Sequence, residues 1–571
     1  MTHRRPRVAV VGGGHNGLTA AAYLARAGIG VTVFERSDHF GGAAISARPF
    51  ADVDANLSRY AYLVSLLPAS IAADLGLDVR LARRRFSSYT PRPGTATGLL
   101  VDAADPVSTA ASFAAAGAAG DSAGFDAFYA RASRLARVLW PTLTAPLPTR
   151  SRARAWFGAD WEDFVERPIG ETIESAVADD LVRGVIATDA LIGTFASPRD
   201  PSLEQNRCLL YHVIGGGTGH WDVPIGGMGT ITTQLIRSAR GAGATLLAAA
   251  EVTSLTPEGE VTWTHDDIAG ADRFDLILMG AAPNLLGRLL GGPRTCGELD
   301  PSPPTSGDHA DVASTGSGSE PHDLTRRDNE PRFRPSAGPA GEAPVARPRG
   351  AQVKANLLLT RLPRLLDSAV DSAAAFGGTF HVHEGYERLS AAYTEAQGGR
   401  VPDPLPCEVY CHSLADPSIL GPSLRRLGCQ TLTVFGLQVP DALVDTIGND
   451  ALRARLTTAV LASLDSVLAE PIEPLLALDA HGAPCVEVKT TRDLEEALAM
   501  PGGHIFHGPL AWPWAEADEP LDTPARRWGV ATEHERILVC GAGARRGGGV
   551  SGIGGHNAAM AALELLSVAV R

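Results

Sequence analysis

Three glycines close to the N-terminus have the spacing of a turn that binds a pyrophosphate group. They are Gly12, Gly14 and Gly17, within the segment GGGHNG. In such a turn the first glycine permits the tight bend, the second lets the backbone approach the pyrophosphate, and the third lets a helix pack closely on a strand. We expect His15 and Asn16 to begin that helix, because the free N–H groups of a helix N-terminus attract phosphate oxygens.

A carboxylate follows at the distance that a nucleotide site needs. Glu35 lies 35 − 17 = 18 residues after Gly17, close to the roughly 20-residue spacing at which an acidic side chain binds ribose hydroxyls. Arg36 comes next, and after a short spacer Gly41 and Gly42 form a second glycine turn. The Glu-Arg pair followed by a Gly pair resembles the extended FAD signature of flavoproteins with two dinucleotide-binding domains. In that signature the second turn brings further backbone to the same pyrophosphate.

The segments around these residues have the pattern of a strand, a helix and a second strand. Residues 8–11 are an apolar run before the glycines, and residues 18–27 are rich in alanine. Residues 31–34 are another apolar run, which ends at the carboxylate. This order predicts the start of a doubly wound, Rossmann-like nucleotide-binding domain.

A further glycine-rich turn lies near the C-terminus. Residues 536–540 read as an apolar strand, and a helix-forming segment begins at about residue 555. Between them stand the glycines and the valine that we expect to contact a cofactor: Gly543, Gly549, Val550 and Gly552. Glycine is used where the backbone must approach another group closely, so this turn is predicted to serve the same cofactor as the first.

Composition and pattern divide the chain into six segments of an α/β protein. A discontinuous FAD-binding domain is expected from residues 1–60, 221–295 and 531–571, and a mixed α+β substrate domain from residues 61–220 and 350–530. Residues 296–349 are rich in Pro, Gly, Ser, Asp and Arg and have few large apolar side chains. Such a segment buries too little surface to offset its ordering entropy, which predicts a disordered insertion, either an inert loop or a regulatory tether.

The overall composition is that of a globular protein without a nucleic-acid partner. Of the 571 residues 44% are hydrophobic and 20% charged, and the net charge of −14 disfavours nucleic acid. No run approaches the ~18 apolar residues that span a bilayer, and no cleavable signal peptide is expected. The seven cysteines include no C-x-x-C pair, which argues against a dithiol redox centre and favours a reducing, cytoplasmic compartment.

No catalytic residue can be assigned from the sequence. His212, His220 and His507 are titratable and stand in segments that could face a flavin, yet each also fits a structural hydrogen bond. No metal site is predicted, because His381 and His383 alternate in an expected strand without a further ligand.

Several stretches resemble the phytoene desaturase-like family of FAD-dependent oxidoreductases. Besides the C-terminal turn, they are residues 60–68, 209–215, 224–229, 354–356 and 505–507. The resemblance covers nearly the whole chain except residues 296–349, and it implies FAD as the cofactor. Carried over, it places Gly12, Gly14, Gly17, Glu35, Arg36 and Gly42 at the ADP half, Val252 on the strand that meets the adenine, and Gly543 with the 549–552 turn near the ribityl chain and the flavin ring.

The family resemblance implies dehydrogenation, desaturation or isomerisation at C–H and C=C bonds of a hydrophobic small molecule, with peripheral membrane contact as an option. One departure is Arg545-Arg546, where the family often has His-Pro. If this pair faces the substrate, it favours a substrate that carries a carboxylate.

An amine oxidase-like flavoenzyme remains an alternative, with Trp512 and Trp514 as the hint of an aromatic cage. A non-catalytic flavoprotein that acts through protein partners is the other. No second nucleotide motif supports a dedicated NAD(P)H domain.

Overall fold

The computed structural model describes residues 4–266, 268–291 and 347–569. Contacts divide the chain into two units, residues 1–292 with 348–571, and residues 293–347. All elements below belong to the first unit. The insertion predicted at residues 296–349 lies almost wholly outside the described residues, so its disorder stays a prediction.

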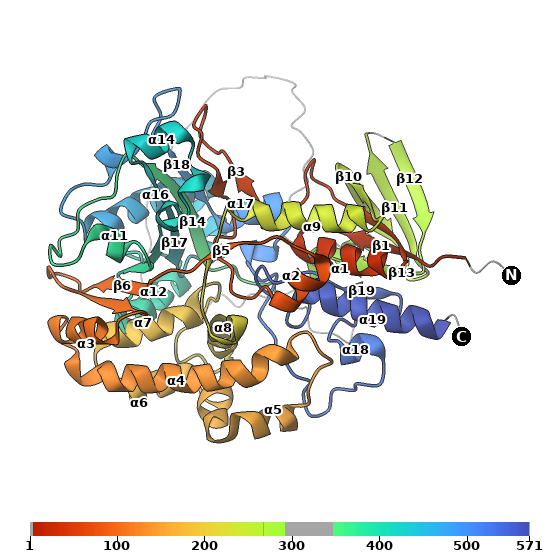
Figure 1. Ribbon diagram of the computed structural model, residues 1–571, viewed down its shortest axis with the longest axis horizontal. Coiled ribbons are helices and arrows are strands. Elements are labelled where there is room, and N and C mark those ends of the chain that lie inside the picture. The colour runs from red at the N-terminus through yellow and green to blue at the C-terminus, as the bar shows by residue number, and fades with distance from the viewer. Residues whose placement is uncertain (1–3, 267, 292–346, 570–571) are drawn as a thin grey trace, which may run out of the picture. The chain divides into compact units, whose positions relative to one another are not determined.

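A five-stranded parallel sheet carries the N-terminal glycine turn (Figure 1). Its order is β19-β13-β1-β2-β9, and each neighbouring pair runs parallel. The strands are β1 (Arg7–Val11), β2 (Gly30–Phe34), β9 (Thr245–Leu247), β13 (Leu276–Met279) and β19 (Ile537–Val539). The predicted α/β class with a Rossmann-like nucleotide-binding domain is confirmed.

Alternate residues of β1 face opposite sides of this sheet, as the period of two in a strand requires. Val8 and Val10 join the core beneath the helices, whereas Ala9 and Val11 join a separate core on the other side. The helices on the first side are α1 (His15–Arg26), α9 (Gly229–Gly241) and α19 (Ile553–Ala569). The second side is covered by an antiparallel sheet of β10 (Ala250–Leu255), β11 (Glu260–His265) and β12 (Ile268–Arg273).

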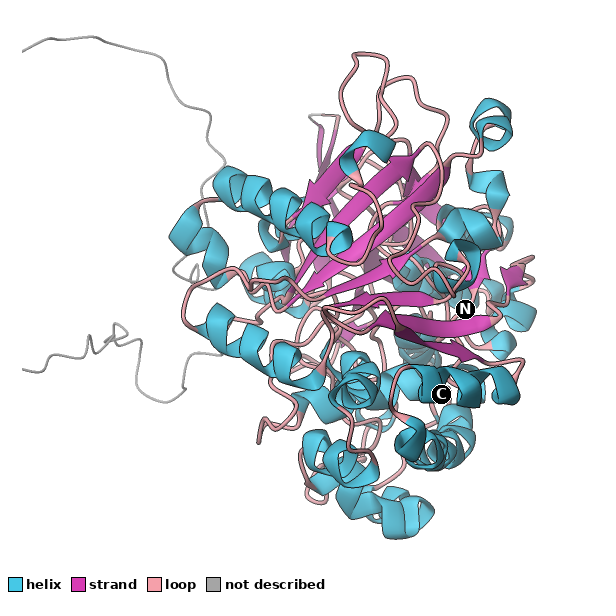
Figure 2. Ribbon diagram, turned by 90° about the vertical axis from the view of Figure 1, so that its left-hand side faces the viewer, coloured by secondary structure: helices cyan, strands magenta, loops and turns pink. Residues whose placement is uncertain are grey.

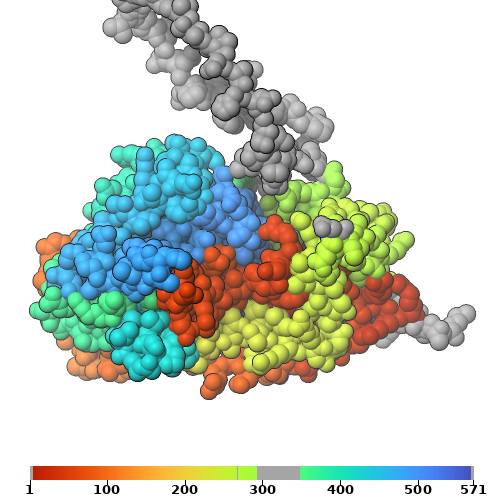
Figure 3. Space-filling view, turned by 90° about the horizontal axis from the view of Figure 1, so that it is seen from above, coloured from red at the N-terminus to blue at the C-terminus, as the bar shows by residue number. Residues whose placement is uncertain are grey.

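Helices α1 and α19 bring the two ends of the chain together. A Cβ added to Gly555 would come within 2.0 Å of the carbonyl oxygen of Asn16, so glycine is needed for the two first turns to lie this close. Viewed from above, N-terminal residues (red) lie between the yellow-green segment and the blue C-terminal half (Figure 3). The two glycine-rich turns, more than 500 residues apart in sequence, therefore meet at one place.

A seven-stranded mixed sheet forms the second part of the body (Figure 2). In spatial order its strands are β18 (Val486–Lys489), β14 (Gln352–Leu359), β17 (Gln430–Leu437), β16 (Cys407–Tyr410), β15 (Thr379–Val382), β6 (Phe86–Pro91) and β7 (Gly98–Asp102). Only β15 and β6 pair in parallel. Val353 and Ala355 of β14 pack into a core with α16 (Asn449–Asp465), whereas Lys354 faces a cavity on the other side.

Helices from both predicted substrate segments contact the larger sheet, for example α3 (Pro106–Ala115) on β7 and α13 (His412–Ala415) on β17. The remaining helices are α2 (Ala69–Leu75), α3 (Pro106–Ala115), α4 (Ser122–Leu139), α5 (Arg150–Phe157), α6 (Ile169–Ala176), α7 (Asp180–Leu191), α8 (Glu204–Val213), α10 (Pro283–Leu289), α11 (Ser372–Ala375), α12 (Tyr386–Gln397), α13 (His412–Ala415), α14 (Pro422–Leu427), α15 (Ala442–Ile447), α17 (Thr491–Leu498) and α18 (Pro524–Arg527). Short strands β3 (Ser46–Ala47) and β4 (Leu57–Ser58) pair with each other, as do β5 (Leu81–Ala82) and β8 (Val223–Pro224). The domain bounds given above stay a prediction.

Within the described ranges, no helix has both the length and the apolar character needed to cross a membrane. Peripheral membrane contact stays a prediction.

Candidate functional site

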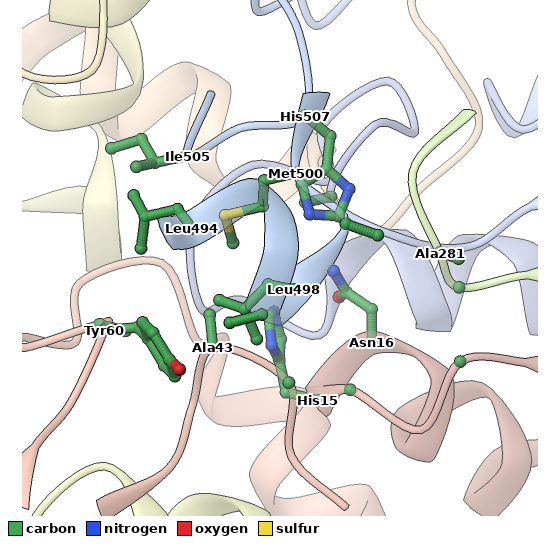
Figure 4. A pocket seen from close by; sticks show the side chains of 18 of the residues that line it. His15, Asn16, Ala43, Tyr60, Ala281, Leu494, Leu498, Met500, Ile505 and His507 are labelled. Atoms are coloured by element: carbon green, nitrogen blue, oxygen red, sulfur yellow. The ribbon is translucent and has the colours of Figure 1, made fainter. Parts of the chain in front are cut away.

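One long cavity joins the glycine-rich turns to an aromatic patch on the seven-stranded sheet. Its volume is about 280 Å³. At one end it is lined by Gly12, Gly14, Glu35 and Val252, and at the other by residues of β14 and β17. Figure 4 shows side chains from α1, the residue 43–60 segment and α17 that line its wall. A single cavity thus connects a nucleotide-type site with a second, apolar end.

Gly12, Gly14 and Gly17 of the first turn each stand where the absence of a side chain matters for a different reason. Gly12 has φ = +99°, a left-handed conformation that glycine adopts at little cost. A Cβ on Gly17 would come within 2.2 Å of the Gly12 carbonyl oxygen, so the third glycine permits the helix to pack on the turn. Gly14 differs, because a Cβ there would meet no atom closer than 3.9 Å and would stand at the cavity wall.

The N-terminus of α1 has no side-chain cap. Gly14 occupies the N-cap position and offers no side-chain acceptor to the first turn. The first N–H groups of a helix have no partner within the helix, and they carry partial positive charge. His15 and Asn16 of this turn line the cavity, so the wall here is suited to an anion.

The carboxylate of Glu35 holds the turn from the next strand. Its Oε2 accepts a hydrogen bond from Gly13 N–H at 2.7 Å, and its Oε1 accepts one from Ser37 N–H at 2.9 Å. A carboxylate has about four acceptor positions, so two remain after these bonds. Glu35 lines the cavity together with Arg36, whose guanidinium donates at 3.3 and 3.4 Å to the carbonyls of Glu496 and Ala497 in α17.

The C-terminal turn contacts the first turn of α1 directly. His15 Nε2 lies 3.0 Å from the Gly549 carbonyl oxygen, and Asn16 donates to the Gly547 carbonyl at 3.4 Å. Gly549 and Val550 line the cavity. Burial lowers the pKa of His15 to about 4, so its imidazole is neutral near pH 7.

Most of the residues proposed from sequence lie on one wall. The cavity is lined by Gly12, Gly14, His15, Asn16, Glu35, Arg36, Gly42, Val252, Gly549 and Val550. Four lie outside the lining and allow close packing instead, Gly17 against backbone and Gly41, Gly543 and Gly552 against side chains. A Cβ on Gly41 would meet Ile45 at 2.6 Å, and one on Gly543 would meet Pro283 at 2.5 Å. Cofactor contact by these four and by the ten others stays a prediction.

Sequence analysis placed Tyr62 and Lys354 in stretches that resemble the family, but it assigned no residue of the aromatic end to the site. Tyr62, Trp221 and Phe435 line the cavity there, and the rings of Tyr62 and Phe435 are 4.4 Å apart. Lys354 lies against both rings, with Nζ 5.3 Å from the Phe435 centroid. Lys354 is one of two lysines in the chain and the only charged residue of β14, a signal that could have singled it out.

Lys354 is almost completely buried, with 2% of its surface exposed. Its Nζ donates to the carbonyls of Ser58 at 2.9 Å and Tyr60 at 2.7 Å. Desolvation lowers the pKa of this amine to about 7, opposed by the charge of Glu487. Near neutral pH the side chain can therefore hold or release a proton. When Lys354 is neutral, its Nζ can donate both N–H groups to these carbonyls and keep one lone pair that accepts a proton.

Of the three candidate histidines, two line the cavity. Burial lowers the pKa of His212 and of His507 to about 4 in each case. His212 Nδ1 bonds to the Cys208 carbonyl at 2.9 Å, whereas the Nδ1 of His507 is buried without a partner. His220 is exposed and does not line the cavity, so the structure gives it no contact with the site.

The arginine pair does not face the cavity. Arg546 is buried and donates to the carbonyls of Thr142, Ala145 and Trp528, at 2.8, 2.7 and 3.1 Å. Arg545 pairs with Glu519 at 2.9 Å. Both guanidinium groups thus hold loops together, and the pair gives no reason to expect a carboxylate-bearing substrate.

The tryptophan hint of an amine cage is also wrong. Trp512 and Trp514 stack at 5.0 Å, but they lie in the helical core and not on the cavity wall.

Cys407 and Cys411 are buried free thiols, as are the other four cysteines in the described part of the chain.

Comparisons with known proteins place the chain among oxidoreductases. A family model described as "NAD(P)-binding Rossmann-like domain" matches residues 10–69. An uncharacterized protein of Mycobacterium tuberculosis (strain ATCC 25618 / H37Rv) is 53% identical over 98% of this chain and 97% of its own length. Pyridine nucleotide-disulfide oxidoreductase domain-containing protein 2 of Rattus norvegicus is 26% identical over 96% of this chain and 92% of its own.

Solved structures share the fold over the full chain. A putrescine oxidase has a TM-score of 0.53 at 16% identity, and each chain is wholly covered. Cyclohexylamine oxidase from Brevibacterium oxydans has a TM-score of 0.51 at 13% identity, again with full coverage of both chains. At such low identity the likeness concerns the fold alone.

Proposed function

We propose that this chain, which belongs to one oxidoreductase family with its mycobacterial relatives, binds FAD without a covalent link and oxidises or isomerises an apolar, unsaturated small molecule. The observation that carries the proposal is the single cavity that joins both glycine turns to the aromatic end. The chain is an oxidoreductase of the FAD/NAD(P)-binding superfamily.

The residues present fit an FAD. Gly14 and Gly42 leave the wall without side chains: a Cβ on Gly14 would find no atom closer than 3.9 Å, and one on Gly42 would meet only the Gly14 Cα, at 3.3 Å. The uncapped α1 N-terminus offers N–H donors to the pyrophosphate. Glu35 retains acceptor positions for ribose hydroxyls, and Val252 lies on the same wall for the adenine.

The turn at Gly549 and Val550 supports the placing of the other half of the cofactor. Gly549 contacts His15, and the nearby Gly547 contacts Asn16, at the proposed position of the pyrophosphate, while Gly549 and Val550 line the cavity. Bound there, a flavin supplies the two-electron acceptor for a hydride from a substrate C–H bond. The chain's own contribution is to orient the substrate and to exclude water.

Lys354 is the residue that could hold or move a proton at the apolar end. Two backbone carbonyls fix its Nζ, and burial brings its pKa to about 7. A general acid or base works best when its pKa lies near the working pH. We assign it the proton that a substrate loses together with a hydride, or that an isomerising double bond gains.

The lining favours a neutral, apolar substrate over an amine. Tyr62 and Phe435 already face a lysine amine, so a protonated amine would meet a like charge or compete with Lys354 for the same rings. The fold shared with amine oxidases keeps amine oxidation as the second candidate. An amine substrate would have to bind as the free base.

Anaerobic stopped-flow spectroscopy of the oxidised protein tests the proposal. We expect bleaching of the flavin by lipophilic polyenes, and slow or no bleaching by NADH, NADPH and simple amines. Rapid reduction by NADH or NADPH at catalytically useful rates would refute it. Rapid reduction by amines would favour the second candidate.

A further inference from the structure

A buried group of metal-ligand side chains lies in the seven-stranded sheet, apart from the cavity lining. It consists of His381, Glu384 and Glu408, each of which offers one ligand atom within 4.8 Å of the others. All three are buried, with 3%, 1% and 2% of their surface exposed. Two carboxylates in such a place need a compensating charge, because burying an unpaired charge is costly.

The register of the sheet brings the three residues together. His381 of β15 is the direct cross-strand partner of Glu408 in β16. Glu384 follows β15 in a turn where His383 has φ = +55°, and the chain then enters α12. Helix α7 packs on this turn at Gly184, where a Cβ would come within 1.8 Å of the Glu384 carbonyl oxygen. The turn therefore has little freedom to move the Glu384 side chain elsewhere.

Surrounding hydroxyl groups orient two of the three side chains. Thr90 Oγ1 lies 2.9 Å from His381 Nδ1, which leaves Nε2 as the free ring nitrogen. Thr188 donates to Glu408 Oε1 at 2.7 Å, and Tyr410 donates to Oε2 of the same carboxylate. Outer hydrogen bonds of this kind hold metal ligands in place, and they use only about half of the acceptor positions of Glu408.

Glu384 is the unexplained member of the group. Neither of its carboxylate oxygens has a hydrogen-bond partner, although the side chain is buried. Thr188 also approaches it, but the single hydroxyl proton of Thr188 is already donated to Glu408. Glu384 Oε2 lies 4.0 Å from His381 Nε2. Two metal bonds of about 2.0–2.1 Å span that distance only when the three atoms lie nearly in line, so the Glu384 carboxylate must turn toward His381 for one ion to bind both atoms at tetrahedral angles.

Burial raises the pKa of Glu408 and the charge of Arg84 opposes this, but Arg84 is a single positive charge beside two glutamates. Arg84 donates to the Trp221 carbonyl at 3.0 Å and to Thr379 Oγ1 at 3.1 Å, and to neither glutamate. Asp189 adds another acidic group, and burial together with Glu408 raises its pKa to about 7. Burial raises the pKa of Glu384 well above its ordinary value, with Glu408 as the next cause. A proton or a cation must supply the missing positive charge.

We propose that His381 Nε2, Glu384 and Glu408 bind a divalent transition metal of the Zn²⁺ or Mn²⁺ class. One imidazole nitrogen and two carboxylates suit such ions, whereas Mg²⁺ and Ca²⁺ prefer oxygen ligands alone. The ion joins β15, the following turn and β16. It also fixes Glu408, whose partner Tyr410 packs at 4.7 Å on Tyr62 of the cavity wall. The site supports the wall of the proposed active site but does not depend on the proposed reaction.

Metal content and thermal shift test this site in the full-length protein. The protein as purified is analysed for bound metals, dialysed against EDTA, and then given ZnCl2, MnCl2 or MgCl2 separately. We expect about one Zn²⁺ or Mn²⁺ per chain and a higher melting temperature with that ion, but not with MgCl2. In Glu384→Gln the affinity for the ion should fall at least tenfold. Loss of a residue that only hydrogen-bonds a metal ligand already lowers metal affinity by roughly 10- to 100-fold.

His383→Asn is the matched control, because it alters a histidine two residues from His381 whose ring bonds to Ser466 and not to the group. It should keep the metal and the thermal shift. Glu384→Gln should fold, since its neutral amide replaces a carboxyl of the same shape. The proposal is overturned if the wild type holds no metal and shows no shift, or if Glu384→Gln binds the ion as tightly as the wild type. If the wild type holds no metal, and Glu384→Gln has the same melting temperature as the wild type, the two glutamates share a proton instead of an ion.

Discussion

Glu35 accepts a hydrogen bond from the backbone N–H of Gly13 at 2.7 Å, and so the carboxylate that follows β2 holds the turn that follows β1. The same side chain binds Ser37 N–H and lines the cavity. One residue thus shapes the phosphate turn and retains acceptor positions for a ribose.

Glu35→Ala should weaken FAD retention by about 1–3 kcal/mol, the scale for losing a charge-assisted hydrogen bond or leaving buried partners unpaired. Flavin remaining after dialysis measures the loss. Asp38→Ala is the control, because this carboxylate is 90% exposed and three residues away. Equal flavin occupancy in Glu35→Ala and the parent would remove Glu35 from the site.

Gly14→Ala should leave the fold intact and still lower FAD affinity. The backbone of Gly14 has φ = −70°, which any residue adopts, and an added Cβ meets no protein atom within 3.4 Å. It would instead occupy the position where the backbone is proposed to approach the pyrophosphate. Melting temperature without flavin and flavin binding are measured in parallel with Gly120→Ala, whose Cβ meets nothing within 4 Å. Unchanged flavin affinity in Gly14→Ala would argue against a pyrophosphate at this turn.

Lys354 should make stability depend on pH. Its pKa is about 7 when folded and about 10.4 in an unfolded chain, so between these values the unfolded state binds more protons. Stability of the wild type relative to Lys354→Met should therefore rise as the pH increases from 7 to 10, and stay constant below about pH 6. Urea unfolding of the flavin-free proteins at pH 6, 7 and 9.5 measures it. A difference that does not change with pH would contradict the lowered pKa.

Arg546→Leu should destabilise the fold without changing substrate preference. The guanidinium donates to three backbone carbonyls, and hydrogen bonds to a charged group contribute about 1.5–3 kcal/mol each. We expect a loss of about 3 kcal/mol or more in the free energy of unfolding, and a smaller loss for Arg545→Ala. If Arg545→Ala instead weakened binding of a polyenoic acid more than that of the matching alcohol, the arginine would face substrate after all.

Excising residues 300–345 should leave folding and flavin content intact. The segment has almost no large apolar side chains to contribute to a core. A short Gly/Ser bridge should close the gap at small cost, because loop closure depends only weakly on length. Loss of soluble, yellow protein would show that the insertion packs on the body.

The local motif was predictable from sequence because its parts are close together in the chain. The apolar run, the glycines, the helix and Glu35 occupy 28 consecutive positions, from Val8 to Glu35, and each follows a short-range rule. The meeting of His15 with Gly549 was expected only in outline, since both turns were assigned to one cofactor.

The apolar end and the buried ligand group depend on sheet pairing between distant segments. Lys354 becomes a site residue because β14 lies beside the carbonyls of Ser58 and Tyr60, 294 or more positions away. Glu408 faces His381 only through the register of β15 and β16. Arg546 shows the reverse error, since a local departure from a family motif suggested a substrate contact where the fold has a structural one.

Identification of the flavin released from the purified chain tests the central claim most directly. Acid precipitation followed by chromatography of the supernatant should give yellow FAD at about one per chain. Flavin that stays with the pellet, FMN in the supernatant, or a chain that carries no flavin and takes up none when FAD is added would contradict the account.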